Sequence, residues 1–258
     1  TAQSLLAVVS SFYAIYHGFS GLKKIAKRIV IYRRYLERQL HEFGFHIEQG
    51  IRFDSFDVYS EKAVDIHKAA LKEGFNLRIL PLGADINDAK GFGISLDELT
   101  DDNEIYKILN FISTALNKKL EIIDKLDGTF QLDGIPLRKD NFLQQNVFQL
   151  NKSESELMRY IYQLAEKDFS LVDGMIPLGS CTMKLNAAAE LNPISWSKFS
   201  AVHPFSPKSQ TNGFLSVISD LEEWISEIVG LAAVSFQPNA GSQGELAGLL
   251  SIRSYFYD

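Results

Sequence analysis

The stretch Ser235-Phe-Gln-Pro-Asn-Ala-Gly-Ser-Gln-Gly-Glu-Leu-Ala-Gly-Leu-Leu250 decides how the C-terminal half of the chain is interpreted. Residues 232–236 are small, β-branched or aromatic, and they predict a short buried strand. Pro238 ends that strand, because proline cannot donate a hydrogen bond to a sheet. Apolar residues at helical spacing then predict a helix that opens at Gly241.

The start of this predicted helix has two interpretations. A strand, a turn of small residues and a helix N-terminus present unpaired backbone N–H groups and the positive end of the helix dipole, which suits a phosphate. Ser242 and Glu245 also stand at capping-box spacing, and a capping box needs no ligand. Both interpretations stay open from this stretch alone. Glycine at 241 and 244 favours a ligand, because a cap requires neither residue.

Length and composition limit the possible classes of protein. The 258 residues allow one large or two modest domains, and an apolar content of 46% is that of an ordinary globular protein. A net charge of -6 argues against nucleic acid or an anionic membrane as the main partner. The single cysteine, Cys181, excludes an internal disulfide framework. We expect no membrane segment, because the longest apolar run, residues 5–16, is too short to span a bilayer.

Hydrophobic periodicity predicts a small α+β domain in the N-terminal part of the chain. Two helices are expected at its start, 3–16 and 22–43, separated by His17 and Gly18, and the basic residues of the second helix are interpreted as a solvated face. The pattern then predicts strands at 51–59, 76–80 and 92–96 and helices at 61–72 and 101–116, the last capped by Asp101.

The remaining residues predict a linker and a second region. Residues 119–150 are polar and carry turn-forming glycine and proline, which favours a linker. Helices are expected at 153–166 and 214–229. The first of them has Leu157, Ile161 and Leu164 as its predicted buried face. Both chain ends lie within apolar helical patterns, so we expect the chain to be part of a longer polypeptide.

Residues 175–186, Met-Ile-Pro-Leu-Gly-Ser-Cys-Thr-Met-Lys-Leu-Asn, are neither helical nor alternating in pattern. Irregular polar chain within an apolar frame is where functional sites tend to lie. A nucleophilic Cys181 would need a histidine beside it, and only His203 of the five histidines lies in the same half, so a small buried thiol is favoured. For Lys184, a surface or ion-paired lysine is favoured over a Schiff base. No group of residues shows metal-ligand spacing, so no metal site is predicted.

Together these segments resemble the glycine dehydrogenases (decarboxylating), the P-proteins of the glycine cleavage system. The resemblance rests on residues 175–186 and 237–249, and it weakens over 119–142. It extends to residues 148–168, His203-Pro204-Phe205 and Tyr16-His17-Gly18. The chain departs from the family at Ser242, where alanine is common, and at Gln144-Gln145-Asn146, where the family often has Thr-His-Pro.

The resemblance implies two similar halves of the fold-type I pyridoxal phosphate architecture, with cofactor in the second half alone. Residues 1–118 would be the closing small domain of the inactive first half, 119–150 the linker, and 151–258 the beginning of the cofactor-binding α/β domain, which is incomplete here. It implies that the cofactor phosphate is held by Gly241, Ser242 and Gln243. It places near the substrate Ser180, Cys181, Thr182 and Asn186. The Schiff-base lysine would lie beyond Asp258, so no catalytic residue is assigned.

The activity implied is pyridoxal phosphate-dependent decarboxylation of glycine, with transfer of the aminomethyl group to the lipoyl arm of the H-protein. A homo-oligomer is implied for the full-length protein, in the cytoplasm of a bacterium or the mitochondrial matrix of a eukaryote. We expect this chain alone to be inactive and without cofactor, and residues 232–236 to pair with another chain or pack irregularly. The alternatives are a non-catalytic phosphate- or nucleotide-binding module using residues 241–244, and an interaction module using residues 22–43.

Overall fold

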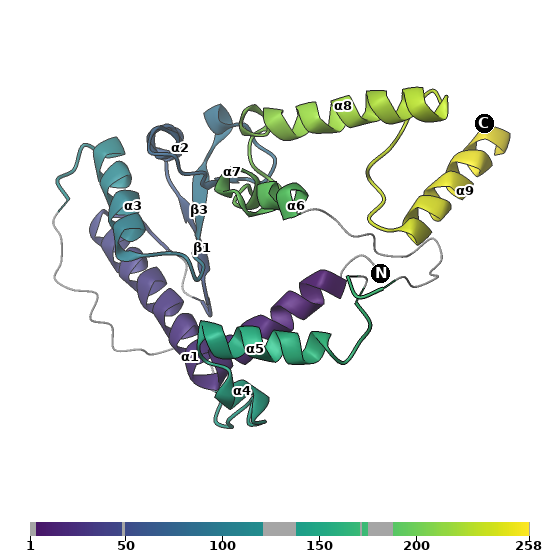
Figure 1. Ribbon diagram of the computed structural model, residues 1–258. Coiled ribbons are helices and arrows are strands. Elements are labelled where there is room, and N and C mark those ends of the chain that lie inside the picture. The colour runs from purple at the N-terminus through teal and green to yellow at the C-terminus, as the bar shows by residue number, and fades with distance from the viewer. Residues whose placement is uncertain (1–3, 48–49, 121–137, 171, 175–187, 258) are drawn as a thin grey trace. The chain divides into compact units, whose positions relative to one another are not determined.

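The computed structural model describes residues 4–47, 50–120, 138–170, 172–174 and 188–257 (Figure 1). Contacts divide the chain into two units, one of residues 13–153 and one of residues 1–12 with 154–258. The predicted boundaries at 118 and 150 stay predictions.

A three-stranded antiparallel sheet forms the centre of the unit 13–153. Its strands are β1 (Ser55–Tyr59), β2 (Arg78–Leu80) and β3 (Gly91–Ser95), and β3 pairs with both others, giving the order β1-β3-β2. In this register Phe56 lies opposite Ile94 on one side of β3, and Ile79 lies opposite Phe92 on the other. The three strands predicted from the sequence are therefore confirmed, with shifted ends.

Three helices build the core of this unit with the sheet: α1 (Ser4–Glu42), α2 (Ala63–Lys72) and α3 (Asp102–Ala115). A 3₁₀ turn (Ile86–Asp88) precedes β3, and a short helix, α4 (Val147–Leu150), lies near the end of the unit. The Asp101 side chain accepts a hydrogen bond from the Glu104 backbone N–H at 2.8 Å, which confirms the predicted cap. The most deeply buried large side chains come from α1, α2, α3, β1 and β3, and they include Leu36, Leu40, Ile66, Ile112, Phe56 and Phe92.

Helix α1 changes direction at Gly18, whose backbone (φ 56°, ψ -170°) is not helical. The predicted helix end at His17 and Gly18 is thus confirmed, but the second helical run begins without the gap expected before residue 22. By length and composition α1 is the one described helix that would allow a membrane crossing. Its apolar part precedes Lys23 and contains the Gly18 break, while residues from 29 onward supply core side chains. The absence of a membrane segment stays a prediction.

The outer face of the sheet carries an ion pair that crosses the central strand. Arg78 on β2 pairs with Asp57 on β1, and both residues are in register with Gly93 of β3. A Cβ atom at Gly93 would lie 2.6 Å from Arg78 Nε and 2.7 Å from Asp57 Oδ1. A side chain at this position would therefore displace the ends of Arg78 and Asp57, whose side chains are 40% and 43% exposed.

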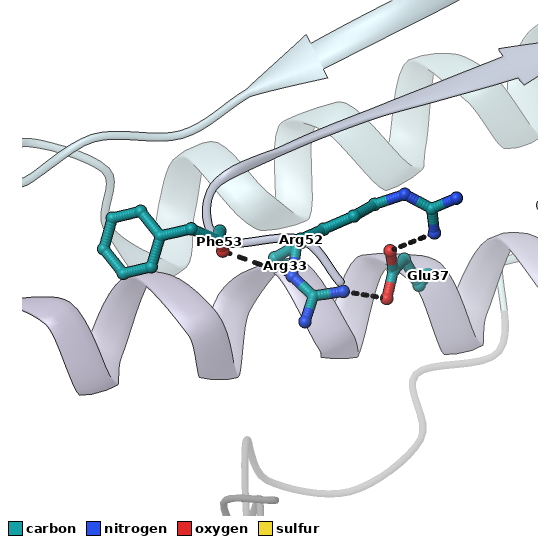
Figure 2. Close-up of polar contacts among 4 residues, drawn as sticks. All are labelled: Arg33, Glu37, Arg52 and Phe53. Carbon is teal, nitrogen blue, oxygen red and sulfur yellow. Dashed lines mark hydrogen bonds and ion pairs between the residues drawn. The ribbon is translucent and has the colours of Figure 1, made fainter. Parts of the chain in front are cut away.

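Buried charge fixes the segment before β1 onto α1 (Figure 2). Arg33 is 5% exposed; it pairs with Glu37 one turn along the helix, and its Nε donates to the Phe53 carbonyl at 3.2 Å. Arg52 Nη1 lies 3.4 Å from the other oxygen of Glu37. The solvated face expected for residues 22–43 thus excludes Arg33, which sequence periodicity did not separate from the exposed basic residues.

In the residues that the structure describes, the second unit contains helices joined by irregular chain. Its helices and its 3₁₀ turn are α5 (Glu154–Ala165), α6 (Ala188–Ser195), α7 (Ser197–Ser200), the turn Lys208–Gln210, α8 (Asn212–Val229) and α9 (Gly241–Tyr257). No described residue of this unit is buried. In α5 the predicted buried face is wrong, since Leu157 and Leu164 are half-buried and Ile161 is exposed.

The strand predicted at residues 232–236 is wrong as well, because these residues are irregular and largely exposed. The irregular packing expected of them agrees with this finding. A single strand needs a neighbour for its backbone N–H and C=O groups, and the described part of this unit offers none. The described residues therefore combine helices with a small antiparallel sheet, which is consistent with an α/β domain, and the fold-type I assignment stays a prediction.

Candidate functional site

The N-terminus of α9 is the candidate site, and it begins where the sequence predicts. Gly241 is the first helical residue, and the Gly244 N–H donates to the Ala240 carbonyl at 3.0 Å. That bond is the first of the helical ladder. The N–H groups of Gly241, Ser242 and Gln243 therefore lie in the first turn, where an α-helix provides no internal acceptor. They are the three residues predicted to bind a phosphate.

The capping-box interpretation does not fit this helix start. A capping serine lies immediately before the helix, with its glutamate at the third helical position. Ser242 is instead the second helical residue, and Glu245 is the fifth. The Ser242 hydroxyl is thus left as a possible fourth donor beside the first-turn amides, while Ala240 takes the position before the helix.

The surroundings of this turn are open in the described part of the chain. A Cβ atom added at Gly241 or Gly244 would meet nothing within 4 Å. Before the turn, Ser235 Oγ accepts a hydrogen bond from the Gln237 N–H at 3.4 Å. The glycines leave room for a group to approach the helix end closely. The positive end of the dipole and the three amides make this position suitable for an anion.

The predicted substrate-side residues lie outside the described residues: Ser180, Cys181, Thr182 and Asn186, together with Lys184. Their assignment stays a prediction. His203, the histidine considered as a partner of Cys181, makes a local contact, because its Nδ1 accepts from the Phe205 N–H at 3.0 Å. Within the described ranges no three His, Cys, Asp or Glu side chains come close enough together to hold a metal ion.

The side chains with perturbed pKa values lie in the other unit, 13–153. Burial, a hydrogen bond to Asp102 and the charge of Asp102 raise the pKa of Tyr32 to about 12. Burial lowers the pKa of the Lys152 ammonium. Sequence reasoning missed both residues. Tyr32 stands on the apolar face of a helix, and Lys152 precedes α5 in a polar segment, so neither has a local pattern that marks it.

Comparison with known proteins agrees with the sequence motifs. Residues 1–112 match the family model described as the glycine cleavage system P-protein. The chain is 54% identical over 256 residues to a glycine dehydrogenase (decarboxylating) of Prochlorococcus marinus (strain NATL2A), an alignment that covers 99% of this chain and 26% of that protein.

Two further proteins with the same name have similar identities to this chain and similar coverage. The protein of Prochlorococcus marinus (strain MIT 9303) is 52% identical over 259 residues, covering 100% of this chain and 26% of the relative. That of Parasynechococcus marenigrum (strain WH8102) is 51% identical over 255 residues, covering 99% and 26%. The chain thus spans about a quarter of the length of the curated relatives it matches. Along essentially its whole length the chain is thus similar to one quarter of these glycine dehydrogenases (decarboxylating), and over residues 1–112 to the family model of the glycine cleavage system P-protein.

Proposed function

We propose that this chain is part of a glycine dehydrogenase (decarboxylating), which removes the carboxylate of glycine and passes the aminomethyl group to the lipoyl arm of an H-protein. The observation that carries the proposal is the identity of 54% over 99% of the chain to a protein of that name. Reduction of the lipoyl disulfide accounts for the two electrons that the oxidative cleavage releases. A homo-oligomer in the bacterial cytoplasm belongs to the same proposal.

The cofactor of the proposed reaction is pyridoxal phosphate, whose ring supplies an electron sink for the electrons left when the carboxylate departs. In this chain the first turn of α9 would hold the cofactor phosphate. The amides of Gly241, Ser242 and Gln243 would donate to its oxygens, and the Ser242 hydroxyl would add a donor. We place Ser180, Cys181, Thr182 and Asn186 on the substrate side, where their polar atoms would orient the carboxylate and amino group of glycine.

The first-turn amides and the helix dipole of α9 should both contribute measurably to the affinity for a phosphate. A hydrogen bond to a charged group contributes about 1.5–3 kcal/mol, and the helix dipole contributes about 0.3–1 kcal/mol to an exposed anion. Loss of one amide donor should therefore weaken phosphate binding about tenfold or more, since about 1.4 kcal/mol corresponds to a factor of ten.

Gly241→Pro tests the phosphate assignment in the complete polypeptide that contains this chain. Proline is well accepted as the first residue of a helix and removes the N–H without ending the helix. We expect the dissociation constant for pyridoxal phosphate to rise about tenfold, while that for pyridoxal, which has no phosphate, does not change. Gly248→Ala, in the same helix and also in open space, is the matched control and should leave both constants unchanged.

Equal affinities in the Gly241→Pro variant and the unsubstituted protein would show that the phosphate lies elsewhere. The activity is tested separately, by glycine-dependent release of carbon dioxide in the presence of lipoylated or unlipoylated H-protein. We expect release with the lipoylated form alone. Binding of a nucleotide such as ADP, without release of carbon dioxide and without affinity for pyridoxal phosphate, would contradict the enzymatic proposal and favour a nucleotide-binding module.

A further inference from the structure

Helix α1 carries a concentration of positive charge that the chain as a whole does not share. It contains seven of the 26 lysine and arginine residues but two of the 32 aspartate and glutamate residues. The whole chain has a net charge of -6, so α1 is a basic element in an acidic chain. One of its two carboxylates, that of Glu37, is already paired with Arg33 and Arg52. The other basic residues of α1 therefore outnumber the carboxylates that remain near them.

Four of these basic residues share one face of the helix. The intervals between them are four, seven and four residues, and side chains at these intervals lie on the same side of an α-helix. They follow the break at Gly18 and extend over about 22 Å, at about 1.5 Å per residue. We call them the basic row: Lys23, Lys27, Arg34 and Arg38.

The basic row faces away from the core. Its side chains are exposed, except that of Arg34, which is half-buried. The opposite side of the same helical run supplies core side chains, among them Leu36 and Leu40. The sheet and the other helices of the unit therefore pack against α1 on the side away from the basic row, and its cations are left at the surface.

Aromatic rings of the helix itself lie beside both ends of the basic row. Lys23 Nζ is 5.5 Å from the centroid of the Phe19 ring, and Arg38 Cζ is 5.9 Å from that of the Tyr35 ring. In the part of the chain that the structure describes, Lys23, Lys27 and Arg38 form no ion pair with a carboxylate. An aromatic ring attracts a cation without neutralising its charge, so this charge remains available to a partner.

The single sign of the basic row is unfavourable for an isolated helix. Lys23 and Lys27 are like charges four residues apart, as are Arg34 and Arg38, and repulsion at this spacing destabilises a helix. A helix face that contacts water alone gains stability when opposite charges alternate along it. A row of one sign therefore favours a binding surface over a face that is only solvated.

We propose that the basic row is a docking surface for a partner protein that presents a row of carboxylates. Charge complementarity identifies this chemistry, because cations along one side of one helix fit carboxylates along one element of a partner. A nucleic acid or an anionic membrane carries negative charge over a wide area, and the net charge of -6 opposes its approach. A carboxylate row meets α1 within the screening length of about 8 Å, where the local positive charge dominates. The proposal does not rest on the enzymatic activity or on the cofactor.

The test measures binding of poly-L-glutamate, a polymer whose charged groups are all carboxylates, to the 258-residue chain by fluorescence anisotropy of the labelled polymer. The triple variant Lys23→Gln/Lys27→Gln/Arg38→Gln removes three exposed charges from the basic row. We expect its dissociation constant to rise about tenfold, because each exposed ion pair contributes a factor of about 1.4–5. An unchanged constant would overturn the proposal.

A second triple variant is the matched control, because it removes the same charge from exposed positions on α2 and α3 of the same unit: Lys68→Gln, Lys72→Gln and Lys107→Gln. Its dissociation constant should change by less than about twofold, since distant surface charges are screened. Equal losses in the two triple variants would show that net charge alone matters, and the docking surface would then be refuted. Circular dichroism of both variants should match that of the unsubstituted chain, which separates lost affinity from lost structure.

Inorganic polyphosphate tests the chemistry of the partner. We expect it to bind the chain more weakly than poly-L-glutamate does at equal charge, and we expect binding of poly-L-glutamate to weaken as salt rises from about 50 to about 300 mM. Polyphosphate that bound more tightly, with an affinity lost in the basic-row variant and kept in the control, would show that the partner carries phosphates. The assignment of a carboxylate-bearing protein would then be wrong.

Discussion

Tyr32 makes the unit 13–153 sensitive to alkaline pH. Its hydroxyl donates to Asp102 Oδ1 at 2.8 Å and so joins α1 to the first turn of α3, while its ring belongs to the core. Burial first, then the hydrogen bond and charge of Asp102, raise the pKa of Tyr32 from 10.0 to about 12. The folded state therefore favours the protonated phenol over a range in which an unfolded chain would lose the proton.

The sign and size of the effect follow from this raised pKa. The stabilisation is fully present below the unfolded pKa of about 10 and is lost as the pH rises toward 12, because the unfolded chain releases the proton first. One pKa unit corresponds to about 1.4 kcal/mol, so an interval of about two units amounts to about 2.7 kcal/mol of unfolding free energy.

Tyr32→Phe isolates this contribution. Below pH 10 the variant should be less stable by about 1–2 kcal/mol, the value of the lost hydrogen bond, since the exposed Asp102 regains water. Phenylalanine does not ionise, so the unfolding free energy of the variant does not fall through ionisation at this position above pH 10. The unfolding free energies of the two proteins should therefore cross at about pH 11.

Urea unfolding followed by circular dichroism between pH 8 and pH 12 measures the crossing. Fluorescence is unsuitable, because both tryptophans, Trp196 and Trp224, lie in the other unit. Tyr59→Phe, at a tyrosine that is 63% exposed, is the matched control. Its unfolding free energy should change with pH in the same way as that of the unsubstituted chain. A difference between Tyr32→Phe and the unsubstituted chain that stays constant from pH 9 to pH 12 would refute the reasoning.

Three further changes test the packing of the same unit by urea unfolding. Gly93→Ala should weaken the half-exposed ion pair across β3 and destabilise the unit by up to about 1 kcal/mol, the value of a surface ion pair. Gly213→Ala, in open space in α8, has no ion pair to displace and is the control. Phe92→Ala empties the centre of the core and should cost about 3–5 kcal/mol, and a smaller loss would indicate that the core collapses into the space. Asp101→Ala removes the cap of α3 and should cost about 1 kcal/mol, whereas an unchanged midpoint would show that water replaces it.

Local features of the fold could be predicted from the sequence, and long-range ones could not. The cap at Asp101 and the helix break at Gly18 depend on a few adjacent residues, and both were predicted. The strand order depends on which segments meet, and periodicity does not contain that information. The buried face expected around Ile161 was wrong for a related reason: spacing shows which face is apolar, but not whether a partner covers it.

At the candidate site too, local features could be predicted from the sequence and long-range contacts could not. The helix start at Gly241 was predicted, because small residues after a turn give a local signal. The position of Ser242 inside the helix could not be separated from a cap, since the two differ by one or two residues in the boundary. Lys152 was missed altogether, because its contact with Ile15 joins residues from opposite ends of the unit.

The strand order β1-β3-β2 has a consequence for how the chain is synthesised. The strand that is last in sequence is central in the sheet, so β1 and β2 leave the ribosome before β3, with which both pair. Until residue 95 has emerged, Phe56 and Val58 have no opposite strand to pack beside, and the edges of both early strands stay open to other chains. Both strand pairings of the sheet therefore depend on the arrival of β3, and α3 emerges soon after it, since only six residues separate β3 from that helix.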